Sequence, residues 1–291
     1  MKIASAAYSL DQLPDWRAYE AKITAWVTEA AGQGADLLVF PEYGAMELAS
    51  LAGMKIAGEL ESSMHFVAGM MGRANALHEG LARKFGVHIL ASGGPAQGDG
   101  PRPVNRSVFF GPTGMLGYQD KQIMIPFERD IMDIRSGDPL AVFDTPIGRI
   151  GILICYDSEF PLLGRSLAEA GAELILIPTC TEKIEGHSRV RIGAMARALE
   201  NQCVTVTSPL VGDAQWCEAV GLSNGAPGVF GPPDLGFPET GILAEGKLNV
   251  PGWIYAQVDL RAVGRVRAEG GVQNYRHWPE QLHRIKTVKK V

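Results

Sequence analysis

The stretch GILICYD, from Gly151 to Asp157, decides how the rest of the chain is interpreted. Its first four residues are uncharged and rich in isoleucine, which predicts a buried strand that ends at Cys155. The next residues, DSEFP from Asp157 to Pro161, predict a turn into a helix, because proline suits the first helical turn. In this interpretation Asp157 forms the turn. A thiol at the end of a buried strand, facing the start of a helix, is placed to act as a nucleophile.

Charged side chains follow two other strands at the point where each strand ends. Glu42 comes just after the buried segment 36–40, and Lys121 comes just after the segment 115–119. Glu42 in particular would lie where a charge is costly unless it has a partner or a role. The sequence therefore predicts that Glu42, Lys121 and Cys155 form one catalytic cluster.

These three residue types suit acyl transfer from an amide-like C–N bond. A free thiol is only a few per cent thiolate near neutral pH, so it needs a base, and Glu42 can accept its proton. Lys121 can favour the thiolate and stabilise the oxyanion that forms when an acyl carbon is attacked. The backbone N–H of Tyr156 can supply a second oxyanion donor if the chain turns sharply there. Glu42 can then return its proton to the departing amine.

Helices alternate with buried strands along most of the chain, which favours a mixed sheet with helices outside it and a single domain over residues 1–291. Strands are predicted at 2–8, 36–40, 87–91, 105–110, 115–119, 139–144, 149–154, 173–178 and 203–208. The last third is expected to alternate between strand and loop, with strands at 220–221, 228–230, 241–244 and 253–258. Helices are predicted from the cap Asp15 to Gly32 and at 61–85, 160–170 and 188–201. The segment 93–103 is expected to be a loop, and the Gly- and Pro-rich segment 221–241 a long functional loop.

Composition excludes several classes of function. A net charge of −5 over 291 residues gives no support to nucleic-acid binding, and no apolar run is long enough to cross a membrane. The four cysteines show neither disulfide-scaffold nor metal-ligand spacing, so no metal site is expected. A cytoplasmic protein with reduced thiols is the resulting expectation.

Three segments, in this order, resemble the motifs of the carbon–nitrogen hydrolase (nitrilase-like) superfamily. They are FPEY at 40–43, YQDK at 118–121 and GILICYD at 151–157, with a weaker match in ARALENQ at 196–202. The resemblance covers nearly the whole chain. It implies a four-layer αββα sandwich, a Glu42–Lys121–Cys155 triad, no cofactor, and homodimers or higher oligomers that extend the sandwich. It also suggests that the C-terminal tail, about residues 260–291, lies at a dimer interface.

Many members of this family have a second glutamate shortly after the lysine, and Glu128 fits that position. It would position the substrate and Lys121; the alternative is an ordinary salt bridge with Arg129 or Arg135. The chain departs from the usual lysine motif at Asp120, where the family often has a basic residue. Its C-terminal third resembles an uncharacterised, amidase-type branch of which some members have an acetyltransferase-like domain, for which this chain has no room.

The walls of the substrate pocket are expected to include Tyr43, Glu128, Thr179, Cys180 and the segment 221–241. A substrate that bears a carboxylate would need an arginine nearby, and the sequence leaves open whether that is Arg129, Arg189 or Arg191.

The leading hypothesis is the hydrolysis of a small, non-peptide amide through a Cys155 thioester. A nitrilase and an acyltransferase that uses an amine acceptor would employ the same triad, so both stay open. A non-catalytic binding or scaffold protein that keeps the fold is the alternative from another class. A papain-like protease is disfavoured, because no histidine has the strand-end context of Lys121.

Overall fold

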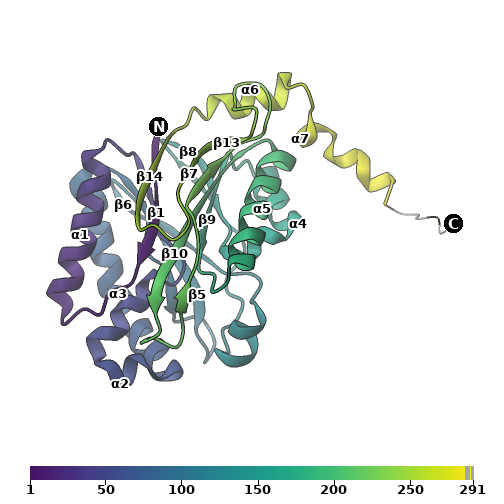
Figure 1. The fold of residues 1–291 in the computed structure, drawn as a ribbon. Helices are drawn as coiled ribbons and strands as arrows, with labels where there is room; N and C mark the ends of the chain where they lie inside the picture. Colours follow the sequence, from purple (N-terminus) through teal and green to yellow (C-terminus); the bar gives the residue numbers. More distant parts are fainter. Residues whose placement is uncertain (286–288, 290–291) are drawn as a thin grey trace.

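Strand β1 (Lys2–Ser9) is the central strand of the sheet. In the computed structural model, which describes residues 1–285 and 289, it runs parallel to β2 (Leu37–Val39) and antiparallel to β14 (Gly252–Gln257). Its end also pairs in parallel with β10 (Val204–Ala214), where Tyr8 lies opposite Leu210. The 14 strands therefore form one continuous sheet, which folds over at β1 and β10 into two halves (Figure 1).

Each half of the sheet has its own strand order. The first half runs β1-β2-β3-β5, with β4 and β6 also paired to β5. The second half runs β10-β9-β8-β7, with β11 and β12 also paired to β10 and β13 paired to β12. The bounds of these strands are β3 (His88–Leu90), β4 (Gly94–Ala96), β5 (Val104–Gly111), β6 (Gly114–Asp120), β7 (Val142–Thr145), β8 (Gly148–Ile152), β9 (Leu174–Thr179), β11 (Gly221–Ser223), β12 (Gly228–Phe230) and β13 (Ile242–Glu245). Parallel and antiparallel pairs occur in both halves, as expected for a mixed sheet.

The inner faces of the two halves pack against each other. Gly151 of β8 faces Leu167 of an outer helix, so its neighbours Ile150 and Ile152 point to the opposite, inner side. Across the halves, the ring of Phe109 meets that of Phe143 edge to face, with centroids 5.5 Å apart. The same core contains Ile3, Leu37, Val39, Leu174, Leu176, Val204 and Val206. Burial of these side chains is the main force holding the halves together.

Helices cover both outer faces. Helices α1 (Trp16–Gly32) and α3 (Leu60–Phe85) lie on the first half, and α4 (Pro161–Glu169) and α5 (Ile184–Asn201) lie on the second (Figure 1). As predicted, the Asp15 side chain caps α1 by accepting a hydrogen bond from Ala18 N at 2.9 Å. The four-layer αββα sandwich is therefore confirmed. The shorter helices are η1 (Gly44–Ala52), α2 (Met54–Ala57), η2 (Phe127–Ile131), η3 (Cys155–Glu159), α6 (Arg261–Glu269), α7 (Asn274–His277) and η4 (Trp278–His283).

Two segments expected to be loops contain strands. Within 93–103 the short strand β4 pairs with β5, and it tolerates Pro95 because it lies at the edge of the sheet. Within 221–241, β11 and β12 both pair with β10. Glycine and proline misled the prediction for 93–103, where β4 is only three residues long and takes its hydrogen bonds from a longer neighbour. Within 221–241 the strand predicted at 228–230 is confirmed as β12. Helix α5 also begins at Ile184, earlier than the predicted Ser188.

The expected C-terminal tail from about residue 260 is largely helical as far as it is described. In α6 the side chains of Ala262, Val263 and Val266 are buried, which attaches this helix to the body. Helix α7 and η4 then extend away from the sandwich (Figure 1). Residues 286–288, 290 and 291 of the tail lie outside the described residues.

No helix in the described part of the chain is both long and apolar enough to span a lipid bilayer.

Candidate active site

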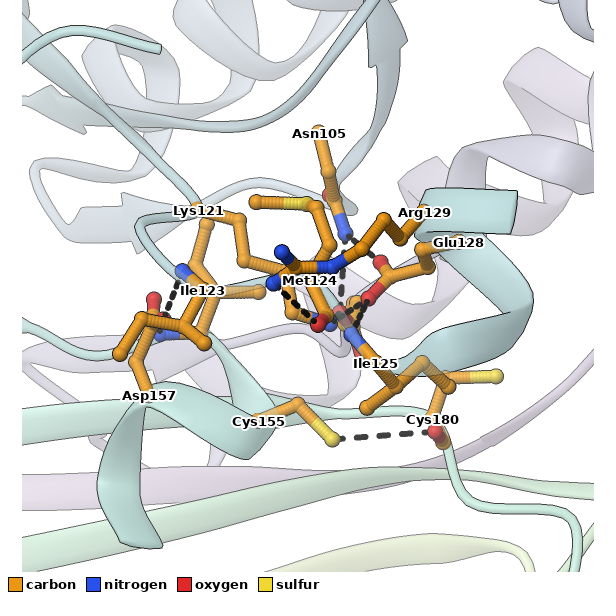
Figure 2. A network of polar contacts seen from close by, with 12 residues as sticks. Asn105, Lys121, Ile123, Met124, Ile125, Glu128, Arg129, Cys155, Asp157 and Cys180 are labelled. Atoms are coloured by element: carbon orange, nitrogen blue, oxygen red, sulfur yellow. Dashed lines mark hydrogen bonds and ion pairs between the residues drawn. The ribbon is translucent and has the colours of Figure 1, made fainter. Parts of the chain in front are cut away.

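The ends of two strands and the short helix η2 bring the predicted charged residues together. Glu42 follows β2, and Lys121 follows β6. The Lys121 ammonium lies 2.7 Å from Oε1 of Glu42 and 2.6 Å from Oε2 of Glu128 (Figure 2). All three side chains are at most 2% exposed. Glu128 therefore pairs with Lys121, and the alternative pairing with Arg129 or Arg135 is wrong.

Cys155 lies at the start of η3, directly after the strand segment that the sequence predicted. Its backbone is in the left-handed region, with φ of 51°, which is unusual for a residue other than glycine and turns the chain sharply at this point. The thiol points toward the carbonyl oxygen of Cys180, 3.7 Å away (Figure 2). The following Tyr156 packs its ring against Phe160, with centroids 4.9 Å apart.

Asp157 ties the cysteine turn to the lysine segment. Its carboxylate accepts hydrogen bonds from Ile154 N at 3.2 Å and from Ile123 N at 2.8 Å, and it also accepts from Gln122 N. The expectation that Asp157 forms the turn is confirmed. Its hydrogen bonds also fix the backbone just after Lys121 relative to Cys155 (Figure 2).

Asn105 is a member of the cluster that the sequence analysis missed. It is fully buried on β5, and its Nδ2 donates to Glu42 Oε1 at 2.8 Å and to Glu128 Oε1 at 3.1 Å. Its backbone oxygen accepts from Lys121 N at 2.9 Å. Asn105 therefore links the two glutamates to each other and lies next to the lysine that they share.

Tyr43 supports the same cluster from the other side. Its hydroxyl donates to Glu128 Oε1 at 2.8 Å, and its backbone, with φ of 55°, is left-handed like that of Cys155. Burial, followed by the charges of Glu128 and Glu42, raises the pKa of the Tyr43 hydroxyl well above its usual value. Tyr43 therefore stays a hydrogen-bond donor.

Burial and the neighbouring charges set the protonation states at the centre. Burial raises the pKa of Glu42 to about 7, although Lys121 acts to lower it. Burial alone would lower the pKa of Lys121, but the charges of Glu128 and Glu42 raise it well above its usual value. Burial and then the charge of Glu42 raise the pKa of Cys155 well above that of a free thiol. The resting centre therefore holds an ammonium, a neutral thiol and a carboxylate that titrates near neutral pH.

Two adjoining cavities open onto this centre. The first, of about 500 Å³, is lined by Glu42, Tyr43, Lys121 and Glu128 among others and is here called the glutamate cavity. The second, of about 670 Å³, is lined by Cys155 and Tyr156 among others and is called the cysteine cavity. The two cavities share the lining residues Ile125, Phe127, Cys180 and Glu182. Glu42, Lys121 and Glu128 therefore border one cavity, and Cys155 borders the other cavity, which adjoins it.

Of three further expected pocket features, one lines the cavities as expected, one lines them only in part and one does not line them. Cys180 lines both cavities. Thr179 lines neither, because its hydroxyl points to the backbone oxygen of Ser208, at 3.5 Å. Of the segment 221–241, only Gly221 and Leu222 reach the glutamate cavity.

The three candidate arginines are engaged elsewhere or lie at the edge. Arg129 donates to the backbone oxygen of Met124, and Arg191 pairs with Glu245. Arg189 lines the cysteine cavity, where it pairs with Glu159 at 3.4 Å. None of the three lines the glutamate cavity.

No group of three or more histidine, cysteine or acidic side chains within residues 1–285 is arranged to hold a metal ion.

Comparisons with known proteins identify the family to which the chain is similar. The model of the carbon-nitrogen hydrolase family matches residues 2–268. The probable hydrolase YhcX of Bacillus subtilis is 31% identical over 99% of this chain and 56% of its own length, so the chain spans little more than half of that relative. The omega-amidase NIT2-B of Xenopus laevis is 27% identical over 81% of this chain and 85% of its own length.

Among solved structures, Saccharomyces cerevisiae Nit3, a member of branch 10 of the nitrilase superfamily, has the same fold. The TM-score is 0.72 at 21% identity, over 92% of this chain and 93% of Nit3. The family model covers most of the chain, and the fold agrees with it. The chain therefore belongs to the carbon–nitrogen hydrolase family.

Proposed function

We propose that the protein hydrolyses the C–N bond of a small, non-peptide amide through a thioester on Cys155. One observation carries the proposal: Lys121 lies between Glu42 and Glu128 beside a cavity that adjoins the cavity lined by Cys155. The similarity to an omega-amidase supports the choice of an amide.

In the first half of the reaction, Glu42 takes the thiol proton while the sulfur attacks the amide carbon. The raised pKa of Glu42, about 7, suits this role, because a base works best when its pKa is close to the working pH. The C–N bond then breaks, and Glu42 returns the proton to the departing amine. In the second half, Glu42 activates a water molecule that attacks the thioester, which releases the carboxylic acid and restores the thiol.

Lys121 stabilises the oxyanion in both halves of the reaction. Its ammonium is buried and held by two carboxylates, so it needs little reorganisation when the charge develops. The sharp turn at Cys155 favours a second donor, the backbone N–H of Tyr156. Glu128, Tyr43 and Asn105 position Lys121 and Glu42.

The decisive experiment is intact-mass analysis after incubation with a panel of small amides and nitriles. We expect an adduct on Cys155 with the mass of the acyl group, together with release of ammonia or amine. Cys155→Ala should form no adduct. Equal and slow reaction of all four cysteines with iodoacetamide, without any adduct, would instead favour a non-catalytic scaffold.

The same experiment separates the remaining alternatives. A nitrilase would form its adduct from the nitriles and not from the corresponding amides. An acyltransferase would accumulate the adduct until an amine acceptor is added.

We also propose that the protein forms homodimers. Leu162 of α4 and Ile192 of α5 are 70% and 64% exposed on the outer face of the sandwich, and Leu282 of the tail is 51% exposed. Apolar side chains in these places suit an interface between copies that includes the tail from about residue 260. Light scattering of the full chain and of a chain shortened before Asn274 compares their molecular masses in solution and so tests the dimer.

We also propose a reducing, cytoplasmic setting for the protein, which the four free cysteines suit.

A further inference from the structure

The rim of the glutamate cavity is acidic. Glu182 and Glu218 line it from two different segments, and both side chains are exposed to solvent. Gln215, the third polar residue at this rim, is uncharged. A ligand that extends from the reacting centre toward solvent would pass these carboxylates.

Most of the remaining lining of the cavity is apolar. It is formed by Ile125, Phe127, Met132, Ala219, Val220 and Leu222 together with Cys180. Such a wall suits an aliphatic chain, which gains free energy as its surface leaves water. The cavity is therefore polar where the amide would react, acidic at its mouth and apolar over most of the remaining lining.

Among the residues that the structure describes, Lys121 is the single cationic side chain in the lining of this cavity. Its ammonium is 1% exposed and is already held by two carboxylates at 2.7 and 2.6 Å. A carboxylate on the far end of a substrate would find no cation there, and it would meet Glu182 and Glu218 instead. Repulsion between these like charges opposes the binding of a substrate that ends in a carboxylate.

The cysteine cavity differs in its charges. It has two cations at its edge, Lys183 and Arg189, but three carboxylates accompany them: Glu159, Glu182 and Glu185. Arg189 pairs with Glu159. An anionic substrate would therefore have to bind in this cavity and compete for cations that have acidic neighbours.

We propose that the glutamate cavity takes the acyl chain of an ω-amino amide, whose far end is a cation that the carboxylates of Glu182 and Glu218 attract. This inference rests on the amidase function proposed above and names its substrate class. Neutral aliphatic amides are weaker substrates, and amides that end in a carboxylate are the weakest.

Three five-carbon amides of nearly the same shape test the proposal: 5-aminopentanamide, pentanamide and glutaramate. Their far ends are cationic, neutral and anionic. We expect kcat/KM to fall in that order, with glutaramate about tenfold or more below 5-aminopentanamide. The difference should shrink as salt rises from low to 0.5 M, since exposed charges are screened. Pentanamide should show no such dependence.

Variants of the two rim glutamates provide a second test of the proposal. The double variant Glu182→Gln/Glu218→Gln should lower kcat/KM for 5-aminopentanamide by about two- to fivefold for each carboxylate removed, and raise it for glutaramate. The turnover of pentanamide reports whether the reacting centre is intact. Glu239→Gln, which removes an exposed carboxylate that lines neither cavity, is the matched control and should change none of the three values.

The outcomes separate this inference from the function on which it rests. If propionamide and all three longer amides fail to form an adduct on Cys155, the amidase function is wrong. If propionamide reacts and the longer amides do not, the glutamate cavity does not take an acyl chain. If glutaramate is the best substrate and Arg189→Gln or Lys183→Gln abolishes that preference, the acyl chain lies in the cysteine cavity. Unchanged preferences in the rim variant would also overturn the inference.

Discussion

Glu42 and Glu47 are two buried glutamates of the same short segment, each paired with a lysine and close to a tyrosine. Glu47 lies 2.5 Å from Lys22 and accepts hydrogen bonds from Tyr8 Oη at 2.7 Å and from Asp11 N at 2.6 Å. Burial raises the pKa of Glu47 as it does that of Glu42. The two sites therefore use the same chemical components under similar desolvation.

The difference lies in what each glutamate faces. The partners of Glu47 come from β1, α1 and the segment between them, and Glu47 lines neither cavity described above. Glu42 shares its lysine with a second carboxylate, and it lies beside a cavity and close enough to Cys155 for each to affect the pKa of the other. A buried Glu–Lys pair is thus structural when its hydrogen bonds are satisfied within the core, and available for chemistry when it borders a cavity and a nucleophile.

The sharpest test of this comparison is the pair of variants Glu42→Gln and Glu47→Gln. We expect Glu42→Gln to lower kcat by about 10²- to 10⁴-fold, because the general base is lost. Glu47→Gln should leave kcat within about twofold and lower the free energy of unfolding by about 1–3 kcal/mol. Amidase kinetics and urea unfolding measure both. Comparable loss of kcat in the two variants would break the distinction.

A smaller effect is expected at Asn105, for which Asn201 is a matched control. Both asparagines are buried, and each donates through Nδ2 while its Oδ1 has no hydrogen-bond partner. Asn105→Leu should lower kcat by about 10- to 100-fold, since two hydrogen bonds to carboxylates are lost. It should also move the acidic limb of the pH profile upward, because the ionised form of Glu42 loses a donor. Asn201→Leu should lower only stability, and a shifted profile there would contradict the assignment.

The pH dependence follows from the pKa of Glu42. The base must be ionised to accept the thiol proton, and burial raises its pKa from the usual acidic range to about 7. kcat/KM should therefore be constant above about pH 8 and fall about tenfold for each pH unit below 7. A pH–rate profile with an uncharged amide measures this limb. A limb near pH 4.5 would show that Glu42 is not the base or that its carboxylate is well solvated.

The smallest effects are expected for the two tyrosines. Tyr8→Phe removes the hydrogen bond to Glu47 and should cost about 1 kcal/mol of stability without changing kcat. Tyr43→Phe removes the bond to Glu128 and should lower kcat by a fewfold, with a similar loss of stability. Thermal unfolding and steady-state kinetics of the two variants, measured side by side, show whether the two networks can be distinguished at this level.

The sequence alone allowed the prediction of the residues at strand ends and the layered fold. Glu42, Lys121 and Cys155 each follow a recognisable buried segment. The position of each residue at the end of a strand could therefore be predicted from the local sequence pattern alone. The motifs then indicated the family and with it the sandwich. The folding-over of the sheet could not be read from local patterns, because it depends on the pairing of Tyr8 with Leu210 and Ser9 with Val211.

Asn105 shows the same limit at the scale of a hairpin. Strands β5 and β6 were both predicted. Counting residues outward from the turn between them, without a bulge, places Asn105 within one residue of its actual position beside Lys121. A bulge between Phe109 and Phe110 shifts the register, so that Arg106 lies opposite Asp120. Because a one-residue shift exchanges the two faces of a strand, an undetected bulge is enough to hide a residue of the site.

The pairing of β1 with β14 also has a consequence for synthesis of the protein. Residues 2–7 are translated well before their antiparallel neighbours, residues 252–257. At typical elongation rates, one edge of the central strand β1 would have no hydrogen-bond partner for roughly tens of seconds. Nascent chains that stall before residue 252 would expose that edge to other strands, so such truncated products are expected to depend on chaperones or to aggregate.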